Sequence, residues 1–295
     1  MKTKKENNMF ARDSFSFEFV DIVEFNLNKI NFVKSIDQLE EPNYIKFYNN
    51  IIYVSDFKLN TITLYDSKCN YMHTLPIKSG KMKNNILGPM GFEIHNNLFY
   101  VCDNQNKRIQ IYDVIKNYAH RGKIGNPGEL NSVECIKWYN NKLFISDSKY
   151  HCIHVYDIKN NKLLYNIGEF GTSENQLNNP SGFTIKDNTI YICDRGNSRI
   201  KLFDINTGEY QKSFNIGYSP RQIKIFNDTI FITHSGNYIS MYSLTGELVN
   251  VFGLDNNFLN VKGIDIFNGK IIVSDINESN STVSLFNIAK YTQGV

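Results

Sequence analysis

Six copies of one short pattern end an apolar run on a residue that could perform acid–base or metal chemistry. In YICDRGNSRIKLFD, residues 191–204, the apolar run ends at Asp194, a polar turn follows, and a second apolar run begins after Arg199. A carboxylate or an imidazole at such a position could act as a general base or bind a metal ion. We call the six equivalent positions the anchors: Asp56, Asp103, Asp147, Asp194, His234 and Asp275.

The spacing of the anchors favours a structural role over a catalytic one. Consecutive anchors lie 47, 44, 47, 40 and 41 residues apart, which is the period of one β-propeller blade. An active site rarely needs the same acid in nearly every blade. We therefore expect each carboxylate to accept hydrogen bonds from backbone amides of the loop after it, with Arg108 and Arg199 within reach for charge-assisted bonds.

The elements that position the anchors follow from the same repeat. About seven residues before each anchor stands a pair of residues that tolerate positive φ, which a tight hairpin turn requires. The pairs are Asn49-Asn50, Asn96-Asn97, Asn140-Asn141, Asp187-Asn188, Asn227-Asp228 and Asn268-Gly269. An apolar strand runs from each turn to its anchor, and a third strand and a more polar fourth one follow. The sequence thus predicts an all-β protein, a six-bladed β-propeller of four-stranded antiparallel blades.

The repeat resembles that of the NHL family of β-propellers, whose repeat ends in a pattern like D-x-x-N-x-R-I-x-x-F. The preceding segment GEFGTSENQLNNPSGFTI, residues 168–185, is similar to the glycine-rich linker between the family's blades. The resemblance covers residues 31–295 and is strongest in blades 2 and 4. Blade 5 departs from it at His234, and blade 6 has a longer loop, so these two blades are either shaped for a function or degenerate.

The last repeat ends after its third strand, STVSLFNI, and leaves blade 6 without an outer strand. The segment KINFVKSI, residues 29–36, resembles the fourth strands of other blades. We expect an N-terminal strand within residues 10–36 to complete blade 6 and close the ring, which removes two sheet edges. Residues 37–295 then form the propeller, as a single domain with residues 10–36. We expect a flexible tail at residues 1–9 and one further strand or rim extension at residues 15–26.

Counting ten residues back from each anchor reaches the inner strand that should line the central channel. We call these positions the channel column: Lys46, Glu93, Lys137, Thr184, Lys224 and Asp265. A calcium site needs six to eight oxygen ligands and gains from negative charge, whereas here three lysines stand beside two carboxylates. We expect ion pairs that neutralise one another, and no metal or cofactor. A hydrolase or lyase with a metal in the channel is the less favoured alternative.

One sector of the predicted loop surface is basic. The linker at residues 77–89 and the next anchor loop carry five cations, which form our candidate binding surface: Lys78, Lys81, Lys83, Lys107 and Arg108. The net charge of the protein is only +3, far below that of a dedicated nucleic-acid-binding protein. Linkers elsewhere on this surface are acidic or neutral. Single-stranded RNA binding by this sector is therefore an alternative and not the first expectation.

We predict from these features a non-catalytic interaction scaffold whose propeller loops contact a protein partner. The five cysteines are odd in number and lack a C-x-x-C pair, which favours a reducing, intracellular and cytoplasmic setting. No apolar run approaches the length that spans a bilayer, so we expect no membrane partner. The identity of the partner and the oligomeric state do not follow from the sequence.

Overall fold

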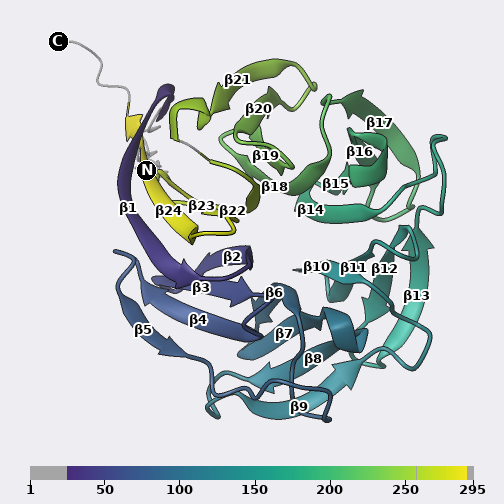
Figure 1. Cartoon of the computed structure of the whole chain (residues 1–295). Coiled ribbons are helices and arrows are strands. Elements are labelled where there is room, and N and C mark those ends of the chain that lie inside the picture. The colour runs from purple at the N-terminus through teal and green to yellow at the C-terminus, as the bar shows by residue number, and fades with distance from the viewer. Residues whose placement is uncertain (1–24, 257, 291–295) are drawn as a thin grey trace, which may run out of the picture.

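The computed structural model describes residues 25–256 and 258–290. Within these residues, twenty-four strands form six four-stranded antiparallel sheets, joined by turns and three short 3-10 helices. The sheets stand as blades around a central axis (Figure 1). The six-bladed, all-β prediction is confirmed. No helix in the described residues has the length and apolar character needed to cross a membrane.

Each blade runs from an inner strand beside the axis to an outer strand on the rim (Figure 1). The inner strands are β2 (Pro42–Tyr48), β6 (Pro89–His95), β10 (Val133–Tyr139), β14 (Pro180–Lys186), β18 (Pro220–Phe226) and β22 (Val261–Phe267). The second strands are β3 (Ile51–Asp56), β7 (Leu98–Asp103), β11 (Lys142–Asp147), β15 (Thr189–Asp194), β19 (Thr229–His234) and β23 (Lys270–Asp275). Each second strand therefore ends on an anchor.

The third and fourth strands complete the blades. The third strands are β4 (Thr61–Asp66), β8 (Arg108–Asp113), β12 (Cys152–Asp157), β16 (Arg199–Asp204), β20 (Ile239–Ser243) and β24 (Ser281–Lys290). The outer strands are β5 (Tyr71–Thr74), β9 (Ala119–Ile124), β13 (Lys162–Ile167), β17 (Tyr210–Asn215), β21 (Leu248–Phe252) and β1 (Phe25–Leu39). The 3-10 helices are η1 (Asn104–Asn106), η2 (Arg195–Asn197) and η3 (Leu254–Asn256).

The hairpin turns between inner and second strands have the geometry that their sequences predict. All twelve residues of the six turns have φ between 45° and 69°. Asn, Asp and Gly adopt this left-handed region at little cost. The turns set the register, so that each second strand is buried on both faces and its anchor arrives at the same level in every blade.

Apolar contacts between blades form the core. Phe92 of blade 2 is fully buried, with its ring 5.1 Å from that of Tyr44 in blade 1 and 5.2 Å from that of Phe99. Burying one such ring stabilises the fold by about 2–3 kcal/mol. Contacts of this kind hold neighbouring blades at fixed positions, and thereby hold the loops that the blades carry.

The N-terminal strand closes the ring, as predicted. β1 pairs antiparallel with β24 in blade 6, from Phe25 opposite Lys290 to Leu39 opposite Ser281. In Figure 1 the purple strand lies along the yellow one. The strand extends three residues past the expected boundary at residue 36. The tail expected at residues 1–9, and the further strand expected at 15–26 up to residue 24, lie outside the described residues.

Candidate functional site

The anchor aspartates lie buried under one face of the ring, which we call the loop face because it carries the anchor loops and the linkers between blades. Asp56 accepts hydrogen bonds from the Glu40 amide, at 2.8 Å, in the linker before its blade, and from the Leu59 amide, at 2.9 Å, in the loop after it. Asp194 likewise accepts one from the Asn178 amide at 2.6 Å. Each carboxylate thus fastens the linker to the blade.

Cationic side chains complete three anchors. The Arg108 Nε donates to Asp103 at 2.7 Å, and the Arg199 Nε donates to Asp194 at 2.6 Å. In blade 3 the ring of His154 takes this place, with its Nε2 3.6 Å from Asp147. Burial alone would lower the pKa of His154, but the interactions with Asp147, Cys152 and Asn166 together outweigh it and raise the pKa to about 10. His154 was not identified from the sequence as a partner of Asp147. A signal was available, because Cys152 stands five residues after the anchor, where blades 2 and 4 have arginine.

Blade 5 replaces the hydrogen-bonded anchor with an aromatic cluster. His234 is 1% exposed, and neither ring nitrogen has a hydrogen-bond partner among the described residues. The ring of Tyr218 stacks on it at 5.4 Å, and the ring of Tyr238 meets it edge-on at 4.3 Å. Burial lowers the pKa of His234 to about 4. The neutral imidazole is therefore a packing element in the folded protein.

This burial makes the stability of the protein depend on pH. Because the folded state holds His234 neutral while the unfolded state protonates it near pH 6.5, stability should be lost as the pH falls from 6.5 toward 4. Urea unfolding at about pH 7 and pH 4.5 should show the wild type losing about 2 kcal/mol more than His234→Phe. Equal losses in both proteins would contradict the buried neutral imidazole.

The channel column meets at the axis as ion pairs. Lys46 pairs with Glu93, and the Lys137 Nζ lies 3.9 Å from the same carboxylate. The Lys224 Nζ lies 2.8 Å from Asp265. Burial opposes ionisation of Glu93, but the two adjacent ammonium groups lower its pKa. Thr184 occupies the equivalent position in blade 4 and contributes no charge.

These ion pairs bear on whether the channel column could bind a metal ion. Among the described residues, no group of three or more His, Cys, Asp or Glu side chains lies close enough to hold a metal ion. Both column carboxylates are already engaged by ammonium groups, so a divalent cation would have to displace them. We expect a chelator to leave the unfolding temperature unchanged in differential scanning calorimetry. A fall of several degrees that added calcium or zinc reverses would revive the channel-metal alternative.

The structure separates the four lysines of the candidate binding surface from Arg108. Lys78, Lys81, Lys83 and Lys107 are exposed and form no ion pair with a described residue. Arg108 does not belong with them, because its side chain is 13% exposed and also donates to the carbonyls of Met82 and Asn85, at 2.7 and 3.0 Å. Its guanidinium holds the linker in shape and is not available to an external phosphate.

Comparison with known proteins supports the repeat assignment. A family model described as the NHL repeat matches residues 177–203, which span most of blade 4's first three strands. The chain carries an NHL repeat within a six-bladed β-propeller. No curated protein sequence matches it.

Solved structures share the fold of this NHL-repeat propeller at low sequence identity. A catalytically inactive virginiamycin B lyase from Staphylococcus aureus, in complex with quinupristin, is 13% identical, and the match spans 88% of this protein and 99% of that lyase with a TM-score of 0.64. A streptogramin B lyase is 15% identical, and the match spans 87% of this protein and 98% of that lyase with a TM-score of 0.62. The computationally designed protein Ika8 is 13% identical over 84% of this protein and 71% of the designed one, with a TM-score of 0.55. These likenesses show the fold alone.

A second charged layer lies above the channel column, at the loop-face end of the axis. It gathers groups from five blades of the propeller, and we call it the channel mouth: Glu41, Glu134, Arg195, Arg221 and Lys262. Glu134, Arg221 and Lys262 could have been found from the sequence by counting thirteen residues back from their anchors, whereas Glu41 lies fifteen residues before Asp56. Each inner strand has a register shift near its start, so the residue thirteen positions before an anchor also reaches the axis. Arg195 comes instead from η2.

Apolar side chains gather beside the channel mouth on blade 5. Tyr218, Leu254 and Leu259 are 53%, 55% and 59% exposed, and with the half-buried Tyr238 they form what we call the apolar patch. The rings of Tyr218 and Tyr238 lie 5.8 Å apart. Gly253 has a φ of 103°, and a Cβ there would approach the Tyr238 backbone and the ring of Phe258, so the linker that carries Leu254 and Leu259 packs against Tyr238.

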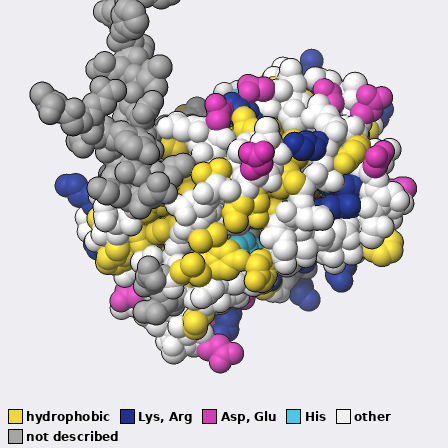
Figure 2. Space-filling model, turned by 90° about the horizontal axis from the view of Figure 1, so that it is seen from above, with side chains coloured by type: hydrophobic (Ala, Val, Ile, Leu, Met, Phe, Trp, Pro, Cys, Tyr) yellow, Lys and Arg dark blue, Asp and Glu magenta, His cyan; other side chains and the backbone are white. Residues whose placement is uncertain are grey.

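Exposed apolar side chains also lie on the rim where blades 5 and 6 meet. Leu248 and Val249 of β21 and Phe32 and Val33 of β1 are exposed, and these two strands are neighbours in the ring. Figure 2 looks onto this side of the rim and shows hydrophobic side chains gathered across its middle. Both divergent blades therefore contribute apolar surface.

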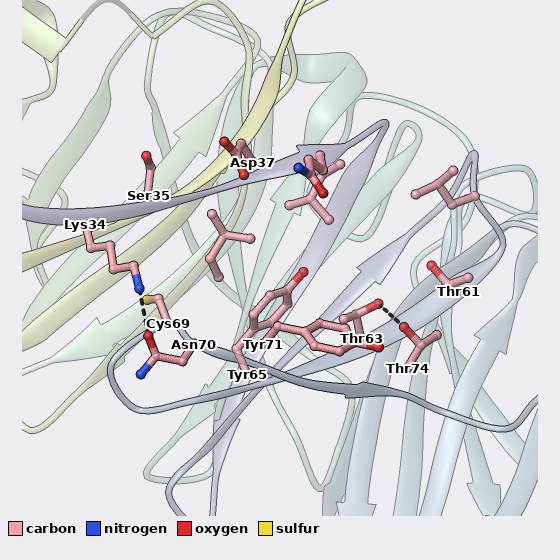
Figure 3. Close-up of a pocket in the computed structure, with 14 residues that line it drawn as sticks. Lys34, Ser35, Asp37, Thr61, Thr63, Tyr65, Cys69, Asn70, Tyr71 and Thr74 are labelled. Carbon is pink, nitrogen blue, oxygen red and sulfur yellow. Dashed lines mark hydrogen bonds between the residues drawn. The ribbon is translucent and has the colours of Figure 1, made fainter.

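A separate groove of about 540 Å³ lies between β1 and the outer strands of blade 1 (Figure 3). The Lys34 Nζ spans it by donating to Asn70 at 2.8 Å, and Tyr65 and Tyr71 form its floor. Thr63 and Thr74 hydrogen bond to each other at 3.1 Å beside them. These contacts engage four of the polar side chains that line the groove, and β1, the strand that closes the ring, forms one of its walls.

Proposed function

We propose that this NHL-repeat propeller is a non-catalytic scaffold that binds a protein partner through the apolar patch on the loop face of blade 5. The observation that carries the proposal is the exposure of more than half of Tyr218, Leu254 and Leu259, on a tyrosine pair and on the linker that packs against it. Exposed apolar patches bordered by polar groups mark sites of protein association. The cations of the channel mouth border this patch, which favours a partner segment that is apolar and acidic.

The enzyme alternative has less support. The lyases that share the fold are 13–15% identical to this protein, and a shared fold does not carry a shared reaction. The side chains at the axis are engaged with one another in ion pairs. These ion pairs support a structural role for the axis, in which the blades hold the loops in place. We therefore propose no reaction for this protein.

We also propose a reducing, intracellular setting for the scaffold. Its support is the state of the cysteines, which are all buried and unpaired: Cys69, Cys102, Cys135, Cys152 and Cys193. Burial raises the pKa of the Cys102 and Cys193 thiols, so the reactive thiolate form is disfavoured. These two residues fill space beside the anchors.

The proposal is tested by capture of partners on immobilised propeller, with and without nuclease. The test variant carries Tyr218→Ser and Leu259→Ser. The control carries Tyr71→Ser and Ile115→Ser, two residues that are 65% and 74% exposed on other blades. We expect a protein that the wild type and the control capture, that nuclease leaves bound, and that the test variant loses. Capture that is equal for both variants would contradict the proposal.

Single-stranded RNA is the second candidate ligand, favoured by the four exposed lysines that form no ion pair within the described part of the chain. If they contact phosphates, affinity should fall steeply with salt, and replacing Lys81 and Lys83 with glutamine should reduce the salt slope by about two. We expect negligible RNA binding at about 0.15 M salt, because the guanidinium of Arg108 is engaged by linker carbonyls and cannot contact a phosphate. Low-micromolar RNA binding in a fluorescence polarisation titration, abolished by these substitutions, would overturn this order.

A further inference from the structure

The channel mouth brings together charged groups from different blades that no repeat motif requires. The Arg195 Nη1 lies 3.7 Å from Glu134, and the Arg221 Nε donates to the Ser235 hydroxyl at 3.0 Å. Ser181 donates to the carbonyl of Arg221 at 2.9 Å and so fixes its backbone. All three cations, Lys262 included, keep part of their surface exposed, so a ligand can reach them from the loop face.

Lys262 is the member of the cluster that lacks a partner. Its ammonium group forms no hydrogen bond or ion pair with any described residue, although the residue is more than half buried. Burial, followed by repulsion from Arg221, lowers the pKa of Lys262 to about 8. A desolvated ammonium with no acceptor is unfavourable unless an anion supplies one.

The charge balance of the channel mouth limits the kind of anion. Three cations stand against Glu41 and Glu134, so the cluster has one positive charge in excess. A single carboxylate would neutralise this excess, whereas the two glutamates would repel a polyanion. The guanidinium group of Arg221 retains donors beyond the Nε that Ser235 engages, and a planar guanidinium suits the two oxygens of a carboxylate.

The channel mouth is also continuous with the apolar patch. Ser219, which follows Tyr218, donates from its hydroxyl to the Arg195 carbonyl at 3.2 Å. The amide of Ser235, beside His234, donates to the Ser219 carbonyl at 3.2 Å. A ligand that places an apolar group on Tyr218 would therefore have its next few atoms close to Arg221.

We propose that the channel mouth binds one carboxylate of a peptide through Arg195, Arg221 and Lys262, with the neighbouring apolar side chains of the peptide on the apolar patch. The carboxylate comes from a Glu or Asp residue or from the C-terminus of a polypeptide. The inference rests on the proposed function, because it names the chemistry by which the protein partner is recognised.

Isothermal titration calorimetry with three peptides tests the inference. The first is an acetylated and amidated Gly-Leu-Glu-Leu-Gly, the second has Gln in place of Glu, and the third has Gln but a free C-terminus. We expect the first or third peptide to bind about tenfold or more tightly than the second. Whichever binds identifies the source of the carboxylate. Equal binding of all three, including no binding, would overturn the inference.

Two protein variants assign the binding to the cluster. Lys262→Gln should weaken the carboxylate peptide about tenfold, and the control Lys149→Gln, on the anchor loop of blade 3, should leave binding unchanged. Unfolding temperatures establish that both variants remain folded. Unchanged binding by a folded Lys262→Gln protein would overturn the inference, as would tighter binding of inorganic pyrophosphate than of the carboxylate peptide.

The two proposals can fail separately. A partner that depends on the apolar patch, together with peptides that all bind equally, would leave the scaffold proposal intact and overturn the carboxylate site. Selective carboxylate binding, together with partner capture that ignores the patch variant, would support the site and overturn the proposed docking surface.

Discussion

Deletion of residues 1–36 is expected to abolish the cooperative unfolding of the propeller. The deletion removes the part of β1 that pairs with β24 from Phe25 to Ile36 and uncovers the edge of β24. It also removes Ile36, which is 6% exposed in the cluster that joins blades 6 and 1. Circular dichroism and scanning calorimetry should show a broad transition at a much lower temperature, or none.

The matched control is deletion of residues 1–9, which leaves β1 whole. We expect its unfolding transition to match that of the full-length protein in temperature and enthalpy. If both truncated proteins unfolded alike, ring closure by β1 would contribute little to stability, and the pairing with β24 would not be the element that holds blades 6 and 1 together.

The fold could be predicted from the sequence because its determinants are local. A positive-φ pair such as Asn140-Asn141 specifies a hairpin by itself, and the run from that pair to Asp147 specifies a buried strand. Six repetitions of these signals agree with one another, so an error in one blade would not have changed the fold. The residue at which β1 ends was harder to predict, because it depends on a contact between distant parts of the sequence. The Ser281 hydroxyl donates to the Glu40 carbonyl at 2.8 Å.

The site was harder to predict because its contacts join blades. The sequence named the members of the channel column, but it could not say that Lys46 and Lys137 share Glu93 while Lys224 takes Asp265. The sequence places Arg108 within reach of its anchor, where the structure has it. It also places Arg108 on the candidate binding surface, because the sequence does not show that the carbonyls of the preceding linker bend back to it. The channel mouth depends on β-bulges that shift the period of the inner strands, and such shifts leave no residue signature.

Replacing Asp194 with alanine is expected to cost about 3–5 kcal/mol of folding free energy. The carboxylate is fully buried and accepts hydrogen bonds from the Asn178 amide at 2.6 Å, the Asn197 side-chain amide at 2.9 Å and the Arg199 Nε at 2.6 Å. The alanine variant leaves the guanidinium of Arg199 beneath the loop without its counter-charge. Urea unfolding monitored by tryptophan fluorescence and circular dichroism measures the loss.

Asp66→Ala is the matched control, because Asp66 also accepts several local hydrogen bonds, from the amides of Lys68 and Asn70 at 2.8 and 2.9 Å, but at an exposed site. Water can replace those bonds, so the expected loss is much smaller than that of Asp194→Ala. The double variant Asp194→Ala with Arg199→Leu should recover part of the loss, since it removes the buried unpaired charge. A loss below about 1 kcal/mol in Asp194→Ala would mean that the repeated aspartate is not a structural anchor, and its role in the NHL repeat would have to be sought in binding.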